Sequence, residues 1–271
     1  MRLSYLAITI LAVAASTAVT MAQDAGAVAP PTTSPSADKA SDAQAVLDRA
    51  AAAGKYTFLF FYREKNEQTD KAWSVFEPAA AKLAKSAETV SIQITDPAEK
   101  PICDRYGVSR APMPLVLAIA PCGAITKGLT KGFDETQLRD AFVSRSTERC
   151  MKALQSRKLV FICVVDQPGP QGQATIPQGV EDFKADAKYA RATEIVLVSA
   201  SDKAEAEFLK EMQVDPSGPK PVAVFLAPPG AMIGKFDGKA TKQQIVAKLT
   251  SAQSGCCPGG QCGPGGCGPK K

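Results

Sequence analysis

Histidine is absent from this chain of 271 residues. Its absence excludes the most common general base of enzymes, the Ser–His and Cys–His nucleophile pairs, and every metal site that needs an imidazole ligand. Phosphate-binding loops, dinucleotide-binding fingerprints and nucleophile elbows are also missing from the sequence. Any chemistry must therefore come from cysteine, carboxylate, lysine or tyrosine side chains.

A clustered basic surface is missing as well. The formal net charge is +5, from 32 Lys and Arg against 27 Asp and Glu, and the basic residues are spread along the chain. Nucleic-acid binding requires basic residues grouped on one face or stripe, so we expect no nucleic-acid partner. The length and the 45% of hydrophobic residues predict about two domains, each with its own core.

The N-terminus has the pattern of an export signal. Arg2 is followed by an uncharged, mostly apolar run over Leu6–Val19, and Ala22 ends a small-residue site that predicts cleavage before Gln23. An uncleaved anchor is the alternative, but the run is shorter than the ~20 apolar residues of a spanning helix. We expect an exported protein, periplasmic or extracellular, without a membrane segment after cleavage and in a compartment where disulfides persist.

The sequence contains an internal repeat. Residues 112–124 (PMPLVLAIAPCGA) and 219–231 (PKPVAVFLAPPGA) share six identical positions at a fixed offset of 107. Self-similarity at the spacing of a domain indicates one fold built twice. The identical pairs are Pro112/Pro219, Pro114/Pro221, Ala120/Ala227, Pro121/Pro228, Gly123/Gly230 and Ala124/Ala231.

Buried strands alternate with helices in both halves. Continuous apolar runs predict strands fully inside a sheet, and a helical period predicts the segments between them. The predicted strands are 56–62, 89–95, 115–119 and 124–129, then 159–165, 194–199, 222–226 and 231–236. The predicted helices are an extra first helix from residue 42, then 71–86 with Pro78 inside, 104–108 and 135–154, and 178–192, 204–212 and 241–251.

This order predicts an α/β protein with two tandem domains, each a central mixed sheet flanked by helices. We divide the chain into a signal peptide (1–22), a linker (23–41), domain 1 (42–148), domain 2 (149–253) and a tail (254–271). The linker and the Cys/Gly/Pro-rich tail hold too few large apolar residues to build a core, so we expect both to be disordered.

The element order and one motif resemble the thioredoxin-like superfamily. Tyr106, Gly107, Val108 and Pro112 match a Tyr-Gly-Val-x-x-x-Pro stretch that in that family places a cis-proline beside the redox site. The resemblance covers about residues 42–145 and, through the repeat, about 155–252. It implies a protein- or peptide-binding or scaffold module for members that have lost catalysis.

The chain departs from that family at the catalytic motif. A thioredoxin needs Cys-x-x-Cys at the start of its second helix, where the helix N-terminus lowers the pKa of the first thiol. The corresponding residues here are 66–69 or 70–73, and no cysteine occurs between Tyr56 and Ile102. Residues 166–178 of the second copy also lack cysteine. We therefore assign no catalytic residue and lean toward a protein that is not an enzyme.

Proline at a strand entrance can adopt the cis form at little cost. Pro112 and Pro219 are our candidates for a structural cis-proline, reached through the bonds Ala111–Pro112 and Gly218–Pro219. The bonds before Pro114 and Pro221 are the competing candidates. The remaining possibility is that all are trans and simply begin edge strands.

Eight cysteines are present, and four of them are concentrated in the tail. Cys163, inside an apolar strand, is expected to be a small buried residue, and Cys103, Cys122 and Cys150 are scattered. The tail thiols could gather Cu(I) or Zn(II), act in redox chemistry, or be oxidised to disulfides. The candidate metal ligands are Cys256, Cys257, Cys262 and Cys267.

The sequence thus supports three functions. The first is an exported, non-catalytic thioredoxin-like protein that binds a protein or peptide partner and needs no cofactor. The second is soft-metal binding through the tail. The third is thiol–disulfide exchange through non-standard cysteines.

Overall fold

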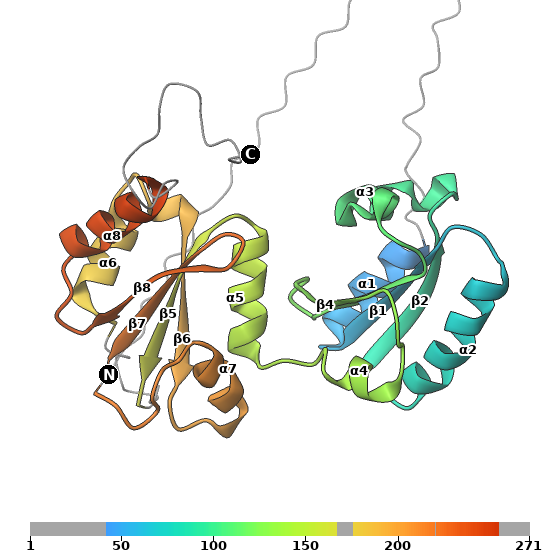
Figure 1. Ribbon diagram of the computed structural model, residues 1–271, viewed down its shortest axis with the longest axis horizontal. Coiled ribbons are helices and arrows are strands. Elements are labelled where there is room, and N and C mark those ends of the chain that lie inside the picture. Colours follow the sequence, from blue (N-terminus) through green and yellow to red (C-terminus); the bar gives the residue numbers. More distant parts are fainter. Residues whose placement is uncertain (1–41, 167–175, 220, 255–271) are drawn as a thin grey trace, which may run out of the picture. The chain divides into compact units, whose positions relative to one another are not determined.

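The computed structural model describes residues 42–166, 176–219 and 221–254 (Figure 1). The signal peptide, the linker and the four tail cysteines Cys256, Cys257, Cys262 and Cys267 lie outside the described residues. Among the described residues, every helix is too short or too polar to cross a bilayer.

The first half forms a four-stranded mixed sheet in the order β2-β1-β3-β4. Strands β1 and β2 are parallel, and β3 pairs antiparallel with both β1 and β4. The elements are α1 (Asp42–Ala52), β1 (Tyr56–Tyr62), α2 (Glu67–Ala81), β2 (Ala87–Gln93), η1 (Pro97–Glu99), α3 (Lys100–Tyr106), η2 (Val108–Arg110), β3 (Leu115–Ile119), β4 (Ile125–Leu129) and α4 (Glu135–Arg139).

The second half repeats this sheet in the order β6-β5-β7-β8, with the same pattern of parallel and antiparallel pairs. Its elements are α5 (Arg145–Gln155), β5 (Leu159–Val165), α6 (Gln178–Ala185), η3 (Ala190–Ala192), β6 (Thr193–Ser199), η4 (Lys203–Glu205), α7 (Ala206–Glu211), β7 (Val222–Ala227), β8 (Ala231–Asp237) and α8 (Lys242–Ser254). The predicted fold, an α/β protein with one sheet architecture built twice, is confirmed.

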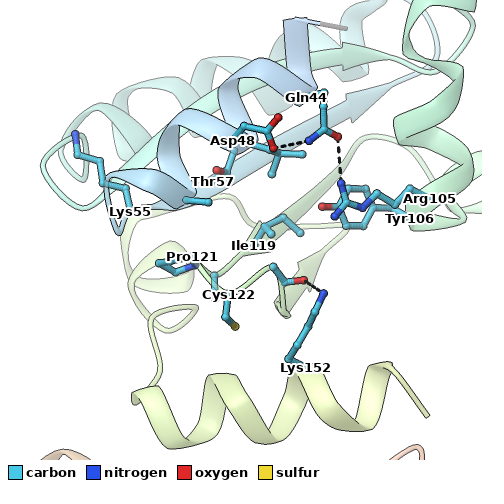
Figure 2. Close-up of a pocket in the computed structure, with 14 residues that line it drawn as sticks. Gln44, Asp48, Lys55, Thr57, Arg105, Tyr106, Ile119, Pro121, Cys122 and Lys152 are labelled. Atoms are coloured by element: carbon cyan, nitrogen blue, oxygen red, sulfur yellow. Dashed lines mark hydrogen bonds between the residues drawn. The ribbon is translucent and has the colours of Figure 1, made fainter. Parts of the chain in front are cut away.

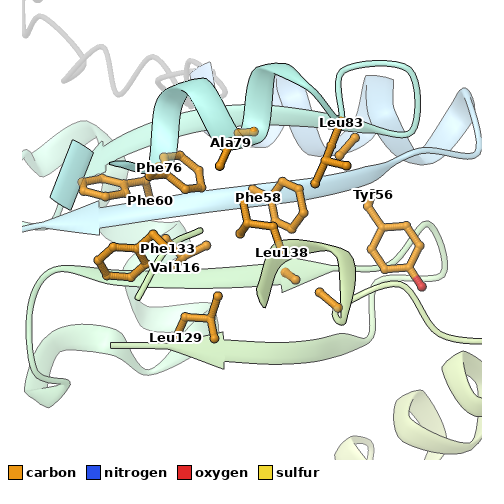
Figure 3. Close-up of a cluster of buried hydrophobic side chains, with 14 of the residues drawn as sticks. Tyr56, Phe58, Phe60, Phe76, Ala79, Leu83, Val116, Leu129, Phe133 and Leu138 are labelled. Atoms are coloured by element: carbon orange, nitrogen blue, oxygen red, sulfur yellow. The ribbon is translucent and has the colours of Figure 1, made fainter. Parts of the chain in front are cut away.

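The central strands of each sheet are buried on both faces and are apolar at nearly every position, with the buried Thr57 as an exception in β1. In β1, Phe58 and Phe60 face the helices α2 and α4, whereas Leu59 and Phe61 face α1 and α3. The first of these clusters, with Phe76 packed on Phe58 and Phe60, is drawn in Figure 3. In the second half, α5 and α7 cover one face and α6 and α8 cover the other.

The prediction of one continuous helix over 135–154 is wrong, because the structure has two helices there, α4 and α5. Asp134 caps α4 by accepting the Gln137 N–H at 3.0 Å, and Ser144 caps α5 by accepting the Thr147 N–H at 3.2 Å. A side chain that caps a helix holds its own backbone outside helical geometry, so the chain restarts at Ser144.

This restart also corrects the expectation that only the first copy begins with an extra helix. Both α1 and α5 have 11 residues, α1 packs on β1 and β2, and α5 packs on β5 and β6. Each copy therefore opens with a helix. A domain boundary at 148/149 falls within α5.

Two further helices differ in extent from the predictions. Helix α2 spans Glu67–Ala81 rather than 71–86, because Asn66 provides a cap four positions earlier than expected. The segment 178–192 contains α6, which ends at Ala185, and the short η3. Pro78 lies inside α2 as predicted.

Candidate functional site

The first turn of α2 occupies the place where the resemblance would put a redox pair. Asn66 is the N-cap, and its Oδ1 accepts the Thr69 N–H at 2.9 Å. Thr69 is buried, and its hydroxyl donates to the Glu64 carbonyl oxygen at 2.9 Å. The two side chains, three positions apart at the start of the helix, are therefore both used to hold the entry into α2.

The turn before β3 lies against this helix start. The Gln68 Nε2 donates to the Met113 carbonyl oxygen at 3.4 Å, and the Arg63 Nη2 donates to the Ser109 carbonyl oxygen at 3.4 Å. The peptide bond Met113–Pro114 in this turn is cis. A cis-proline thus stands beside the first turn of α2.

The prediction that Pro112 follows a cis bond is wrong. Among the described residues the cis bonds precede Pro114 and Pro229, and the bonds before Pro112 and Pro219 are not cis. Ala111 has an extended backbone (φ −72°, ψ 149°), as a residue before a proline prefers, and the cis turn comes next to Leu115, the first residue paired with β1. The bond before Pro221 involves residue 220, which lies outside the described residues.

Met113 is a functional candidate that the sequence reasoning missed. Its neighbours Pro112 and Pro114 have no backbone N–H, so Met113 supplies the single donor of this stretch. Within the described part of the chain, its N–H has no hydrogen-bond partner. The signal was available in the spacing Pro-x-Pro, which leaves one donor between two residues that cannot donate.

The four described cysteines form no disulfide with one another. Cys103, Cys122, Cys150 and Cys163 are all free thiols, and of these Cys122 is exposed and the others are buried. Burial raises the pKa of Cys150 to about 11 and that of Cys163 to about 12, and burial, followed by the nearby Glu99 carboxylate, raises the pKa of Cys103. The expectation that Cys163 is a buried apolar residue is confirmed.

The described residues also lack a cluster of side chains that could bind a metal ion. No group of three or more Cys, Asp or Glu side chains among the described residues could hold a metal ion. Cys256, Cys257, Cys262 and Cys267 lie outside those residues, so the tail hypothesis stays a prediction.

In the second copy, the β7–β8 hairpin is among the described residues, but the segment that leads into α6 is not. Its hairpin turn between β7 and β8 carries the cis bond Pro228–Pro229. Residues 167–175, which precede α6, lie outside the described residues. The site that can be built from contacts is therefore that of the first copy.

No known protein-family model and no curated protein matches the sequence. Solved structures do match. The germline-specific thioredoxin Deadhead of Drosophila melanogaster is 19% identical, with a TM-score of 0.30, over 37% of this chain and 90% of that one. The N-terminal domain of the alkylhydroperoxide reductase AhpF from Enterococcus faecalis is 20% identical, with a TM-score of 0.26, over 75% and 95%. The zinc-bound form of human ERp44 is 13% identical, with a TM-score of 0.32, over 78% and 59%.

The fold assignment rests on the topology of the chain itself. Both sheets have one parallel and two antiparallel pairs in the same strand order, and both are covered by helices on their two faces. In the first copy a cis-proline directly precedes β3 and faces the start of α2. The chain is built from two tandem domains of the thioredoxin-like fold.

Proposed function

We propose that this protein is an exported, non-catalytic thioredoxin-like protein that binds an extended segment of a protein partner at the cis-proline turn of its first domain. The observation that carries the proposal is the chemistry of the first turn of α2. An amide at Asn66 and a hydroxyl at Thr69 stand where exchange would need two thiols, and both are hydrogen-bonded within the helix start. Neither group can form or resolve a mixed disulfide.

The binding element is the backbone of Met113. The Met113 N–H, which has no partner among the described residues and lies next to an exposed Pro112, can donate a hydrogen bond to a carbonyl oxygen of an incoming extended peptide. Main-chain pairing of this kind supplies affinity, and side-chain contacts supply selectivity. The half-buried Met113 side chain packs on the apolar cluster behind it and so fixes the direction of its backbone.

The test is a selection from a library of random linear peptides on the mature protein. The best peptide is then titrated against the variants Met113→Pro, which removes the N–H, and Met113→Leu, which keeps it. We expect Met113→Pro to weaken binding by roughly tenfold and Met113→Leu to have little effect, because one main-chain hydrogen bond is lost in the first variant only.

Two outcomes would overturn the proposal. One is the failure to enrich any peptide. The other is a peptide that binds Met113→Pro as tightly as the unchanged protein, with circular dichroism showing that the variant is folded.

Export is supported by Arg2, the apolar run that follows it and the small residues ending at Ala22. N-terminal sequencing of protein recovered from the medium or periplasm tests it, with Gln23 as the expected first residue. A protein that retains Met1 in the cell would contradict it.

A further inference from the structure

A second site lies at the other end of the first sheet. Strand β3 runs antiparallel to β1, with Leu115 opposite Phe61 near the cis-proline turn and Ile119 opposite Thr57 at the far end. The β3–β4 turn at that far end contains Cys122, where the second copy has Pro229. Gly123 closes the turn with φ of 79° and an N–H that donates to the Ala120 carbonyl oxygen at 2.7 Å.

A cavity of about 200 Å³ adjoins this turn (Figure 2). Its walls come from α1, from the end of α3, from the turn itself and from Lys152 of α5. A cavity of this size admits a small polar group with a few carbon atoms, since drug-sized ligands occupy roughly 300 Å³ or more.

Positive charge dominates the cavity wall. Lys55, Arg105 and Lys152 line it, with Asp48 as the single carboxylate. The Lys152 Nζ donates to the Gly123 carbonyl oxygen at 3.1 Å, and the Arg105 Nη1 donates to Gln44 Oε1 at 3.1 Å. Among the described residues, Lys55, Arg105 and Lys152 are not paired with a carboxylate, and they outnumber the single Asp48 in the wall.

Cys122 is the cysteine that lines this cavity. It is exposed, whereas Cys103, Cys150 and Cys163 are buried and have raised pKa values. Its Sγ donates a weak hydrogen bond to the Glu148 carbonyl oxygen at 3.7 Å, which holds the sulfur beside α5. A solvent-accessible thiol in electropositive surroundings is the setting in which cysteine reacts with disulfides.

We propose that the cavity beside Cys122 captures small anionic disulfides, such as the oxidised form of a carboxylate-bearing thiol, as a covalent adduct. The Cys122 thiol loses its proton to solvent, and the thiolate attacks one sulfur of the incoming disulfide. A new S–S bond to Cys122 forms, the original S–S bond breaks, and the other half leaves as a thiolate. Lys152 and Arg105 attract the carboxylates and place the disulfide next to Cys122. This site is independent of the peptide-binding proposal.

The experiment uses the mature full-length protein, reduced and then freed of reductant. It is mixed separately with three disulfides of similar size: dithiodiglycolate, which is anionic, hydroxyethyl disulfide, which is neutral, and cystamine, which is cationic. Reactions are stopped with an alkylating agent, and the adduct on Cys122 is quantified by peptide mapping, which separates it from adducts on the tail cysteines. Cys122→Ser verifies the peptide assignment.

We expect dithiodiglycolate to modify Cys122 faster than either other reagent. Lys152→Gln should lower that rate by roughly three- to fivefold, the effect of one partly exposed charge pair, and leave the rate with hydroxyethyl disulfide unchanged. Lys85→Gln is the matched control, because Lys85 is exposed and does not line the cavity. It should leave both rates unchanged.

Three results would overturn the proposal. The first is an equal rate with the anionic, neutral and cationic disulfides. The second is an equal loss of rate in Lys152→Gln and Lys85→Gln, which would show only an effect of net charge. The third is a main product in which Cys122 is joined to a tail cysteine instead of the added reagent.

Discussion

Tyr56 provides a direct test of how β1 is held to the segment that follows α4. Its hydroxyl donates to Glu148 Oε1 at 2.6 Å and accepts the Val143 N–H at 3.2 Å. The ring is buried and packs against Phe142 with their centroids 4.6 Å apart. Burial, followed by the hydrogen bond to Glu148, raises the pKa of Tyr56, which is consistent with a hydroxyl held in its neutral form.

Tyr56→Phe removes both hydrogen bonds and keeps the ring. Glu148 and Val143 are half-buried, so water replaces the lost partner only in part. We expect the free energy of unfolding to fall by about 1–2 kcal/mol. For a domain of this size that loss shifts the urea midpoint by roughly 0.5–1 M.

Trp73 reports the transition without further labelling. It is the single tryptophan of the chain and packs edge-on against Phe60, with their centroids 5.0 Å apart. Tyr62→Phe is the matched control, because the Tyr62 hydroxyl has no hydrogen-bond partner among the described residues, and its midpoint should stay unchanged. Equal midpoints for Tyr56→Phe and Tyr62→Phe would refute the reasoning.

Two other perturbations test the buried and the tail cysteines. Burial raises the pKa of Cys163 from 9.0 to about 12, so the stability that depends on its neutral thiol is present below pH 9 and is lost as the pH rises toward 12. Between about pH 8 and pH 11 the unchanged protein should lose about 3 kcal/mol more stability than Cys163→Ala in denaturant titrations, and parallel losses would contradict this. If the tail binds Cu(I) or Zn(II), anaerobically purified protein should lose its metal when residues 255–271 are removed, and equal metal content in both forms would end that hypothesis.

The sequence predicted the ends of most strands within a residue or two, because a short continuous apolar run is typical of a strand buried inside a sheet. Helix ends were predicted less well. Helix α5 begins after the cap Ser144, and α2 begins after the cap Asn66. From the sequence alone, a polar residue within a helical pattern can be either an N-cap or an exposed residue in the middle of a helix.

The candidate site was predicted only in outline. The missing Cys-x-x-Cys could be read directly, whereas the choice between Pro112 and Pro114 depended on where β3 begins its pairing with β1. The cavity at Cys122 could not be predicted, since it is formed by side chains from α1, α3 and α5 that are distant in the sequence.

The central claim, that the thioredoxin-like site of the first domain has lost disulfide exchange, is tested most directly by insulin reduction with dithiothreitol as the electron source. The mature protein should show no turnover above background. The double variant Asn66→Cys, Thr69→Cys, which places two thiols at the first turn of α2, should gain activity because a helix N-terminus lowers the pKa of a thiol. Turnover by the unchanged protein at the level of the double variant would contradict the claim.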